Sequence, residues 1–194
     1  MAQDFPSLAG QLLIAMPALN DPNFENTVTL ICEHNESGAM GLTINRPMDL
    51  THSDVFEQIA EYDEIPTTER NARKGREPVL KGGPVALERG FVLHREKGNW
   101  DATLDIADDV YVTMSRDVLQ SMLTDEGPRS ATMALGYAGW EAEQLEAEIL
   151  ANAWLTTPAT AHIVFDTPYE ARWDKATEAI GVKREQLSGP AGHA

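Results

Sequence analysis

Residues 27–47, TVTLICEHNESGAMGLTINRP, place two apolar runs on either side of a short polar, glycine-containing segment. The first run, residues 27–32, is rich in the β-branched residues that favour strands. The second run, residues 41–45, follows a turn signal at residues 34–38, and two such runs with a short connection predict a β-hairpin. The chain is therefore expected to contain an antiparallel strand pair that brings His34, Asn45 and Arg46 to strand ends.

The rest of the chain mixes the two types of element without a strict strand–helix–strand repeat. Strands are expected at residues 11–16, 79–81, 90–94, 103–106, 110–113, 130–136 and 154–157, and helices at 54–60, 116–123, 140–150 and 168–180. Residues 161–165 fit either type. Several neighbouring strands are spaced like hairpins, which favours an α+β fold with a mixed sheet and helices packed on it. No linker divides the chain, so we predict one domain over residues 1–185 and a disordered tail over 186–194.

The charge balance limits the partners, because 15 basic residues stand against 31 acidic ones for a net charge of −16. Duplex DNA is bound by neutralising phosphates with clustered Lys and Arg, so nucleic acid and anionic membranes are disfavoured. The one cysteine, Cys32, excludes an intrachain disulfide and fits a reducing compartment. The first ten residues lack the pattern of a signal peptide, and no apolar run is long enough to span a bilayer. We therefore expect a cytoplasmic protein.

Cys32 and His34 are the only candidates for catalysis in the hairpin. Two positions apart in an extended strand, they are expected to share a face, where an imidazolium lowers a thiol pKa and activates it. The alternative, which we favour, is a small buried hydrophobe followed by a turn residue. No metal site is expected, because His34, His52, His94 and His162 are scattered without paired ligand spacing.

Asn45 and Arg46, ahead of Pro47, form the second group of candidates. An arginine fork matches phosphate or carboxylate, so Arg46 is a candidate anion ligand. The alternative is a turn whose arginine pairs with an acid of this acidic surface, and the residue types favour that alternative.

The glycine pair Gly82 and Gly83, followed by Pro84, is the third group. Consecutive glycines let backbone amides approach an anion closely, or simply form a tight turn. His94 ends the next predicted strand and is expected to face the same place. Residues 136–140, GYAGW, are expected to link a strand to a helix, whose amides attract anions, but they match no nucleotide-binding fingerprint.

The basic residues are concentrated in one segment, where four of the fifteen lie within seven positions: Arg70, Arg73, Lys74 and Arg76. We expect an exposed loop there. It is the one place at which an acidic partner or nucleic acid would attach.

Several segments, taken in order, carry a family resemblance: GQLLIAMP at 10–17, EHNESGAMGL at 33–42, GGPV at 82–85, GFVLH at 90–94, GYAGW at 136–140, FDTP at 165–168 and Arg172-Trp173. As a set, running from about residue 10 to 182, they resemble the YqgE/AlgH family of bacterial proteins. The resemblance implies an α+β fold around a mixed, partly closed sheet. Some members are labelled transcriptional regulators linked to alginate production, and no established reaction or cofactor comes with the family. The family usually has a glycine where this chain has Glu143.

These observations favour a cytoplasmic regulatory protein without an enzymatic reaction or a cofactor. It would act through a cleft for a small anionic ligand or for a protein partner. The candidate lining residues are His34, Asn45, Arg46, Gly82, Gly83, Pro84 and His94. Two alternatives stay open, namely an enzyme or redox-sensitive protein that uses Cys32, and a DNA-binding regulator that uses the basic segment from Arg70 to Arg76.

Overall fold

A long strand, β9 (Ala131–Glu141), joins the two halves of the sheet in the computed structural model, which describes residues 6–62, 75–124 and 126–187. The C-terminal half of β9 pairs antiparallel with β3 (Gly38–Thr43). Its N-terminal half lies between β6 (Val85–His94), which runs antiparallel, and β5 (Pro78–Lys81), which runs parallel. One strand therefore belongs to both halves, and the sheet is mixed.

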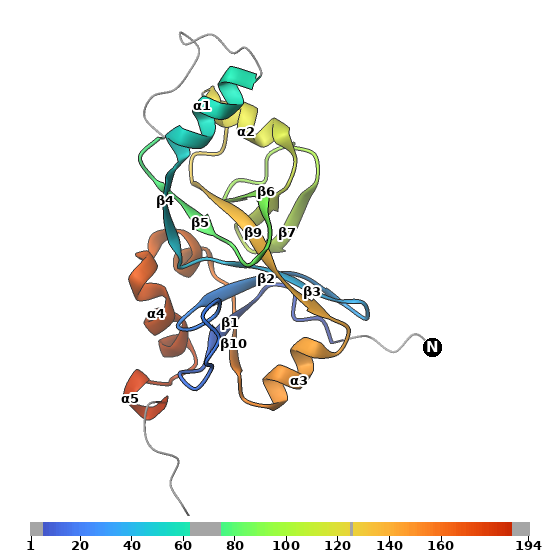
Figure 1. Ribbon diagram of the computed structural model, residues 1–194, viewed down its shortest axis with the longest axis vertical. Coiled ribbons are helices and arrows are strands. Elements are labelled where there is room, and N and C mark those ends of the chain that lie inside the picture. Colours follow the sequence, from blue (N-terminus) through green and yellow to red (C-terminus); the bar gives the residue numbers. More distant parts are fainter. Residues whose placement is uncertain (1–5, 63–74, 125, 188–194) are drawn as a thin grey trace, which may run out of the picture.

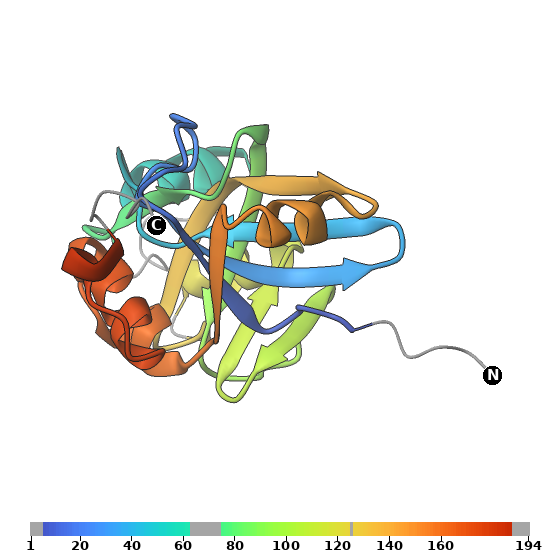
Figure 2. The same ribbon diagram turned by 90° about the horizontal axis from the view of Figure 1, so that it is seen from below.

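The remaining strands extend the sheet on both sides of β9. In the described part of the chain the order is β10-β1-β2-β3-β9-β6-β8-β7, and β4 pairs with β5 off this path. The bounds are β1 (Gln11–Ala15), β2 (Val28–Asn35), β4 (Pro47–Thr51), β7 (Thr103–Ala107), β8 (Val110–Thr113) and β10 (Trp154–Pro158). The sheet curls so far that a Cβ on Gly10, just before β1, would lie 2.7 Å from the Ile106 carbonyl oxygen of β7 (Figure 2).

Glycines make a close backbone crossing possible where the two halves meet. Gly136, in the middle of β9, has φ +71°, and a Cβ there would lie 2.6 Å from the Gly83 carbonyl oxygen. A Cβ on Gly82 would lie 2.3 Å from the Gly136 carbonyl oxygen, and one on Gly83 only 2.1 Å from Tyr137 backbone. Only glycine fits such contacts and tolerates the positive φ.

The helices cover the sheet in three places, each over its own apolar cluster (Figure 1). Helices α1 (His52–Tyr62) and α2 (Arg116–Leu123) pack at one end, where Phe56, Val118 and Met122 are buried. Helix α3 (Gln144–Leu150) covers β3 and β9 through Leu145. A C-terminal segment packs against β1 and β2 through Trp173 and consists of η3 (His162–Asp166), η4 (Tyr169–Ala171), α4 (Arg172–Ala179) and α5 (Arg184–Leu187).

The predicted α+β class, the mixed and partly closed sheet, and the hairpin within residues 27–47 are confirmed. The predicted helix over 140–150 begins only at Gln144, because β9 continues to Glu141. The ambiguous residues near 161–165 form a π-helix. Gln186 and Leu187, predicted to lie in a disordered tail, belong to α5, while residues 188–194 lie outside the described residues. The domain boundary at 185 stays a prediction. No helix in the described ranges is long and apolar enough to cross a membrane.

Candidate functional site

Cys32 lies at an irregularity of β2, where the pairing register with β3 shifts between Ile31 and Glu33. The extra residue interrupts the alternation of faces. Cys32 points into the core cluster that contains Leu30, and its Sγ lies 3.6 Å from the Leu30 carbonyl oxygen. The expected shared face with His34 is therefore wrong. Burial raises the pKa of the Cys32 thiol far above its usual value, so the thiol is protonated at neutral pH.

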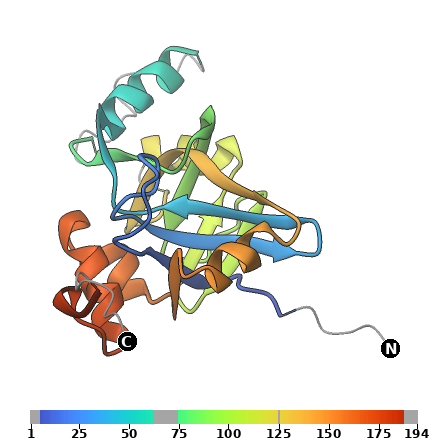
Figure 3. The ribbon, with the colours of Figure 1, turned by 60° about the horizontal axis from the view of Figure 1, so that its bottom comes forward.

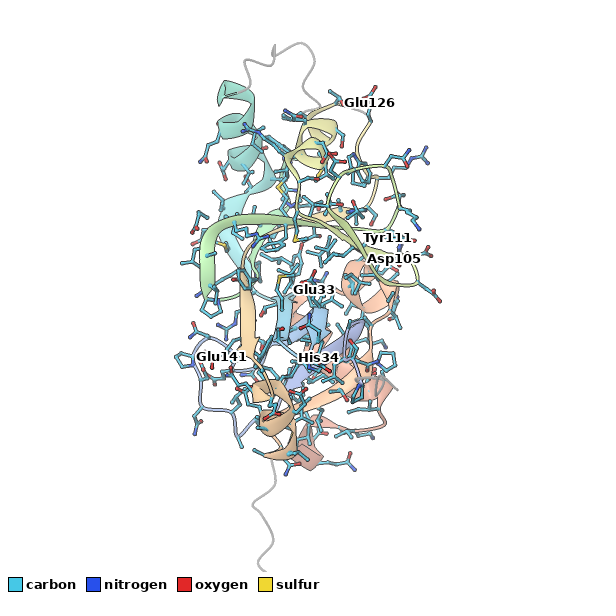
Figure 4. The ribbon with its side chains drawn as sticks, turned by 90° about the vertical axis from the view of Figure 1, so that its right-hand side faces the viewer. Glu33, His34, Asp105, Tyr111, Glu126 and Glu141 are labelled. Carbon is cyan, nitrogen blue, oxygen red and sulfur yellow. The ribbon has the colours of Figure 1, made fainter. Side chains whose placement is uncertain are left out.

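His34 lies on the opposite side of β2, beside α3 (Figure 4). The Leu8 backbone N–H donates to Nδ1 at 2.9 Å, so the ring proton is on Nε2, which donates to Glu146 Oε1 at 3.0 Å. The Ser7 hydroxyl also donates to the His34 carbonyl oxygen. His34 therefore joins the segment before β1 to α3.

Asn45 and Arg46 both hold the loop between β1 and β2. Asn45 accepts a hydrogen bond from the Val28 N–H at 2.8 Å and donates to the Asn26 carbonyl oxygen at 2.9 Å. The Arg46 guanidinium donates to the carbonyl oxygens of Pro22 and Glu25, both at 2.8 Å. This arginine binds backbone carbonyls of its own chain, and within the described ranges it forms no ion pair with an acidic side chain.

The Gly82 amide donates to the Leu135 carbonyl oxygen at 2.8 Å, so it is not open to an anion. Its own carbonyl oxygen accepts from the Thr43 N–H. Together with the close approach of Gly82 and Gly83 to β9, these bonds make the glycine pair a crossing point between strands. Pro84, which follows, is exposed.

His94 is fully buried, and both ring nitrogens have partners. Nδ1 lies 2.7 Å from the Glu96 carbonyl oxygen and Nε2 2.7 Å from Thr113 Oγ1. The ring stacks on Tyr111 and meets the Trp100 ring edge-on at 5.0 Å. Burial lowers the pKa of His94, which favours its neutral form. Figure 4 shows Tyr111 well away from His34.

Six of the seven predicted ligand-binding residues therefore have a local structural role, and the seventh, Pro84, is exposed. None of them lines either of two well-formed pockets within the described ranges. These two pockets do not bring the seven residues together, and a cleft that unites them stays a prediction.

The larger pocket, with a volume of about 530 Å³, lies elsewhere. It opens between the start of β9, the start of β5 and the segment from η3 to α4. That segment lies at the foot of β4 (Figures 1 and 3). Its size falls within the range of small-molecule sites. The lining residues are His52, Arg76, Glu77, Pro78, Met122, Pro128, Arg129, Ser130, Ala131, Thr132, Phe165, Asp166, Thr167, Pro168, Tyr169 and Arg172.

Arg172 is the most unusual residue of this pocket, because its side chain is charged and the residue is only 3% exposed. Nε donates to the Thr167 carbonyl oxygen at 3.0 Å, and Nη1 donates to the Ile44 carbonyl oxygen. No carboxylate within the described ranges pairs with it, and Nη2 has no hydrogen-bond partner there. In the same ranges no fully buried side-chain nitrogen or oxygen lacks a partner, so Nη2 is open to the pocket that Arg172 lines.

The side chain of Arg172 is desolvated, and this lowers its pKa to about 10. The guanidinium is still protonated at neutral pH. Burying a cation without a direct ion pair is costly, and desolvation outweighs the attraction of Tyr169 and Glu170, so that the shift from 12.5 corresponds to a penalty of about 3 kcal/mol. An anion bound at Nη2 would offset that penalty.

His52 supplies a second buried donor to the same pocket. It is 1% exposed, and its Nε2 accepts a hydrogen bond from the Met133 N–H at 3.2 Å. The proton of the neutral ring is therefore on Nδ1. That N–H has no hydrogen-bond partner among the residues described. Because no fully buried side-chain nitrogen or oxygen in those residues lacks a partner, Nδ1 must keep some exposure, and we place this exposure at the pocket that His52 lines. Burial lowers the pKa of His52 to about 4, so the ring is neutral at physiological pH.

The charges around the pocket differ from those of the chain as a whole. Two further arginines, Arg76 and Arg129, line it and are exposed, and no ion pair ties either of them to a described carboxylate. Of the two acids in the lining, Asp166 is paired with Arg95 at 2.8 Å. Three arginines and two acids thus surround a pocket in a protein with twice as many acids as bases.

Sequence reasoning found only fragments of this site. Arg76 belongs to the predicted basic segment, whose other members Arg70, Arg73 and Lys74 lie outside the described residues. His52 was considered only as a metal ligand, and within the described ranges no group of three metal-binding side chains exists. Arg172 was noted only as part of a family motif. Its signal was an arginine beside Trp173 in the first turn of a helix, a position that reads equally well as solvent-exposed.

Comparison with known proteins places these features in a family. A family model described as AlgH-like matches residues 12–185. A "UPF0301 protein" of Saccharophagus degradans is 49% identical over 193 residues, which cover 100% of this chain and 92% of the relative. One from Legionella pneumophila is 48% identical and covers 97% of both chains.

Two solved structures are similar to the fold described above. The solution structure of the AlgH protein from Pseudomonas aeruginosa has a TM-score of 0.77 and 46% identity, and covers 100% of both chains. A crystal structure of a Corynebacterium diphtheriae protein has a TM-score of 0.67 at 21% identity, with 92% of this chain and 89% of that one covered, and shows the shared fold alone.

Proposed function

The chain belongs to the AlgH-like family, and from this premise we propose that it is a non-enzymatic regulatory protein that binds a small anionic ligand in the pocket around Arg172. In this proposal it acts in the cytoplasm, and any effect on transcription is indirect. The net charge of −16 supports an indirect effect, because a duplex would be repelled by most of the surface.

One observation carries the proposal: a buried guanidinium whose Nη2 opens onto a pocket of about 530 Å³ without a protein counter-ion among the described residues. Anions are bound by such preorganised donors, since the donors are fixed before the ligand arrives. Arg172 is fixed by two backbone carbonyls, and the ring of Tyr169 supports its guanidinium.

The alternative of an enzyme or redox-sensitive protein that depends on Cys32 has less support. A nucleophilic or oxidisable cysteine needs an accessible thiolate. Cys32 is 5% exposed and lies in the apolar core, away from the pocket lining.

The test is a titration of the purified full chain with inorganic phosphate, sulfate and acetate, followed by calorimetry and by thermal unfolding. We expect at least one of these anions to bind and to raise the unfolding temperature. Arg172→Gln should abolish that shift. Replacing the buried Arg172 also tests the stability of the fold, so Arg129→Gln at the exposed rim is a second variant, which we expect to weaken binding several-fold.

Arg89→Gln is the matched control, because it removes an exposed arginine on β6, outside the pocket. It should leave anion binding unchanged. Equal binding by wild type, Arg172→Gln and Arg129→Gln, or no binding of any anion, would overturn the proposal.

A further inference from the structure

The ligand class can be narrowed if the pocket binds an anion as proposed above. We propose that the ligand is an organic anion whose carboxylate or phosphate head is held between Arg172 and His52, and whose apolar body lies against Met122 and Phe165. This inference rests on the proposed function and adds to it the second donor and the body of the ligand.

The two donors are connected through neighbouring residues of β9. The guanidinium carbon of Arg172 lies 4.5 Å from the centre of the Tyr169 ring, and the Tyr169 hydroxyl interacts with the Thr132 side chain. The next residue, Met133, donates its N–H to His52. Arg172, through Tyr169, and His52 are therefore both connected to residues 132–133 of β9, and both line the pocket.

Both groups can only donate toward the pocket. Nη2 of Arg172 is a donor at every pH of interest, and the proton of the neutral His52 ring is on Nδ1, as its bond from Met133 requires. A ligand that satisfies both must present acceptors to both donors, which the oxygens of a carboxylate or a phosphate monoester supply. A cation or an amine would leave both buried donors without partners.

The volume argues for a ligand larger than an inorganic ion. A pocket of about 530 Å³ is in the range occupied by drug-sized molecules, and a lone phosphate would leave most of it to water. Beside the polar groups, several apolar residues also line the pocket: Pro78, Met122, Pro128, Ala131, Phe165 and Pro168. An apolar body against these residues would add hydrophobic stabilisation to the electrostatic attraction of the head.

The test compares ligands that share a head and differ in the body. Dissociation constants are measured by calorimetry for acetate against phenylacetate and for inorganic phosphate against phenyl phosphate. We expect the aromatic member of at least one pair to bind about tenfold more tightly or better. The pair with the larger gain then identifies the head as carboxylate or phosphate.

Two variants separate the contribution of the ligand's apolar body to the affinity from that of its anionic head. Phe165→Ala should reduce the gain from the aromatic body and leave the affinity for acetate or inorganic phosphate within about twofold. Leu150→Ala is the control, because Leu150 is a highly exposed apolar residue at the end of α3, outside the pocket. It should leave every dissociation constant unchanged.

The role of His52 is read from nitrogen NMR of the imidazole in the full chain. Adding the ligand should shift the Nδ1–H signal of His52 and leave that of His94, whose nitrogens already have partners, in place. Binding that depends on Arg172 but leaves the His52 signal unmoved, or equal affinities within each ligand pair, would overturn this inference while the proposed function stands. A failure of every anion to bind would overturn both.

Discussion

The guanidinium of Arg172 stacks on the ring of Tyr169, with 4.5 Å between the guanidinium carbon and the ring centre. The two residues lie three apart, at the junction of η4 and α4, and both line the pocket. The flat guanidinium is therefore held from one face by the ring and in its own plane by two carbonyl oxygens. This arrangement fixes the direction of Nη2, which is the atom left for a ligand.

Removing the ring should loosen the arginine without removing its charge. Cation–π contacts are worth about 0.5–2 kcal/mol, so Tyr169→Leu should weaken anion binding about three- to thirtyfold. Tyr169→Phe keeps the ring and loses only the hydroxyl, and its affinity should stay within about threefold of wild type. Calorimetric titration with phosphate or phenyl phosphate measures both variants. A Tyr169→Leu protein that binds like Tyr169→Phe would show that the ring does not position Arg172.

Acid should destabilise the fold through His52. Its pKa is about 4 in the folded protein and 6.5 when exposed, so between these values the unfolded chain binds the extra proton. The contribution of His52 to the free energy of unfolding is therefore fully present above about pH 6.5. It is lost as the pH drops toward 4, and the loss amounts to about 3 kcal/mol. Urea unfolding at pH 7, 5 and 4 measures the loss.

His52→Gln isolates this contribution, because His94 and the carboxylates titrate in both proteins. Glutamine keeps an acceptor for the Met133 N–H but has no proton to gain. The variant should lose less stability than wild type between pH 7 and 4. Two parallel stability curves would mean that His52 is not buried in its neutral form.

Most helices and strands could be predicted from the sequence, because the residues that favour each element lie within that element. The bounds of α2, Arg116–Leu123, were predicted to the residue, and the first hairpin follows from two β-branched runs and a turn. Strand β4 was missed, since its five residues begin with Pro47 and are mostly exposed, without an apolar pattern. The irregularity at Cys32 was also invisible, because a register shift depends on the partner strand and not on the bulged residue.

The pocket could not be predicted from the sequence, because the residues that line it are brought together only by contacts between distant parts of the chain. The parallel pairing of β5 with β9 brings Arg76 and Pro78 to the start of β9. The hydrogen bond from Arg172 to Ile44 then brings the C-terminal segment to the same place from 128 residues away. Likewise, the sequence indicated that Gly82 and Gly83 permit close approach, but not that the neighbours they approach are Gly136 and Tyr137 of β9.

Cys32 should be chemically inert in the folded protein. Its thiol is buried, and desolvation together with the neighbouring Glu33 raises its pKa, so almost no thiolate is present at pH 7. Iodoacetamide should alkylate it at least about 100-fold more slowly than a model thiol, at a rate limited by opening of the structure. Mass spectrometry follows the reaction, and protein unfolded in guanidinium chloride is the control that must react quickly. Fast alkylation of the native chain would reopen the possibility of a Cys32-dependent activity.

The strand crossing at Gly136 should be sensitive to substitution of the glycine. Alanine there must adopt a φ of +71° and place its Cβ 2.6 Å from the Gly83 carbonyl oxygen, which belongs to a neighbouring backbone that cannot easily move. We expect Gly136→Ala to lower the free energy of unfolding by about 2–4 kcal/mol, and the unfolding temperature by about 5–15 °C.

Gly139→Ala on the same strand is the matched control. Its Cβ would meet only the edge of the Tyr137 ring at 3.4 Å, and its φ is not in the left-handed region. That variant should stay within about 1 kcal/mol of wild type. If the two alanines had equal effects, the crossing would have enough room for a side chain, and the glycines at 82, 83 and 136 would need another explanation.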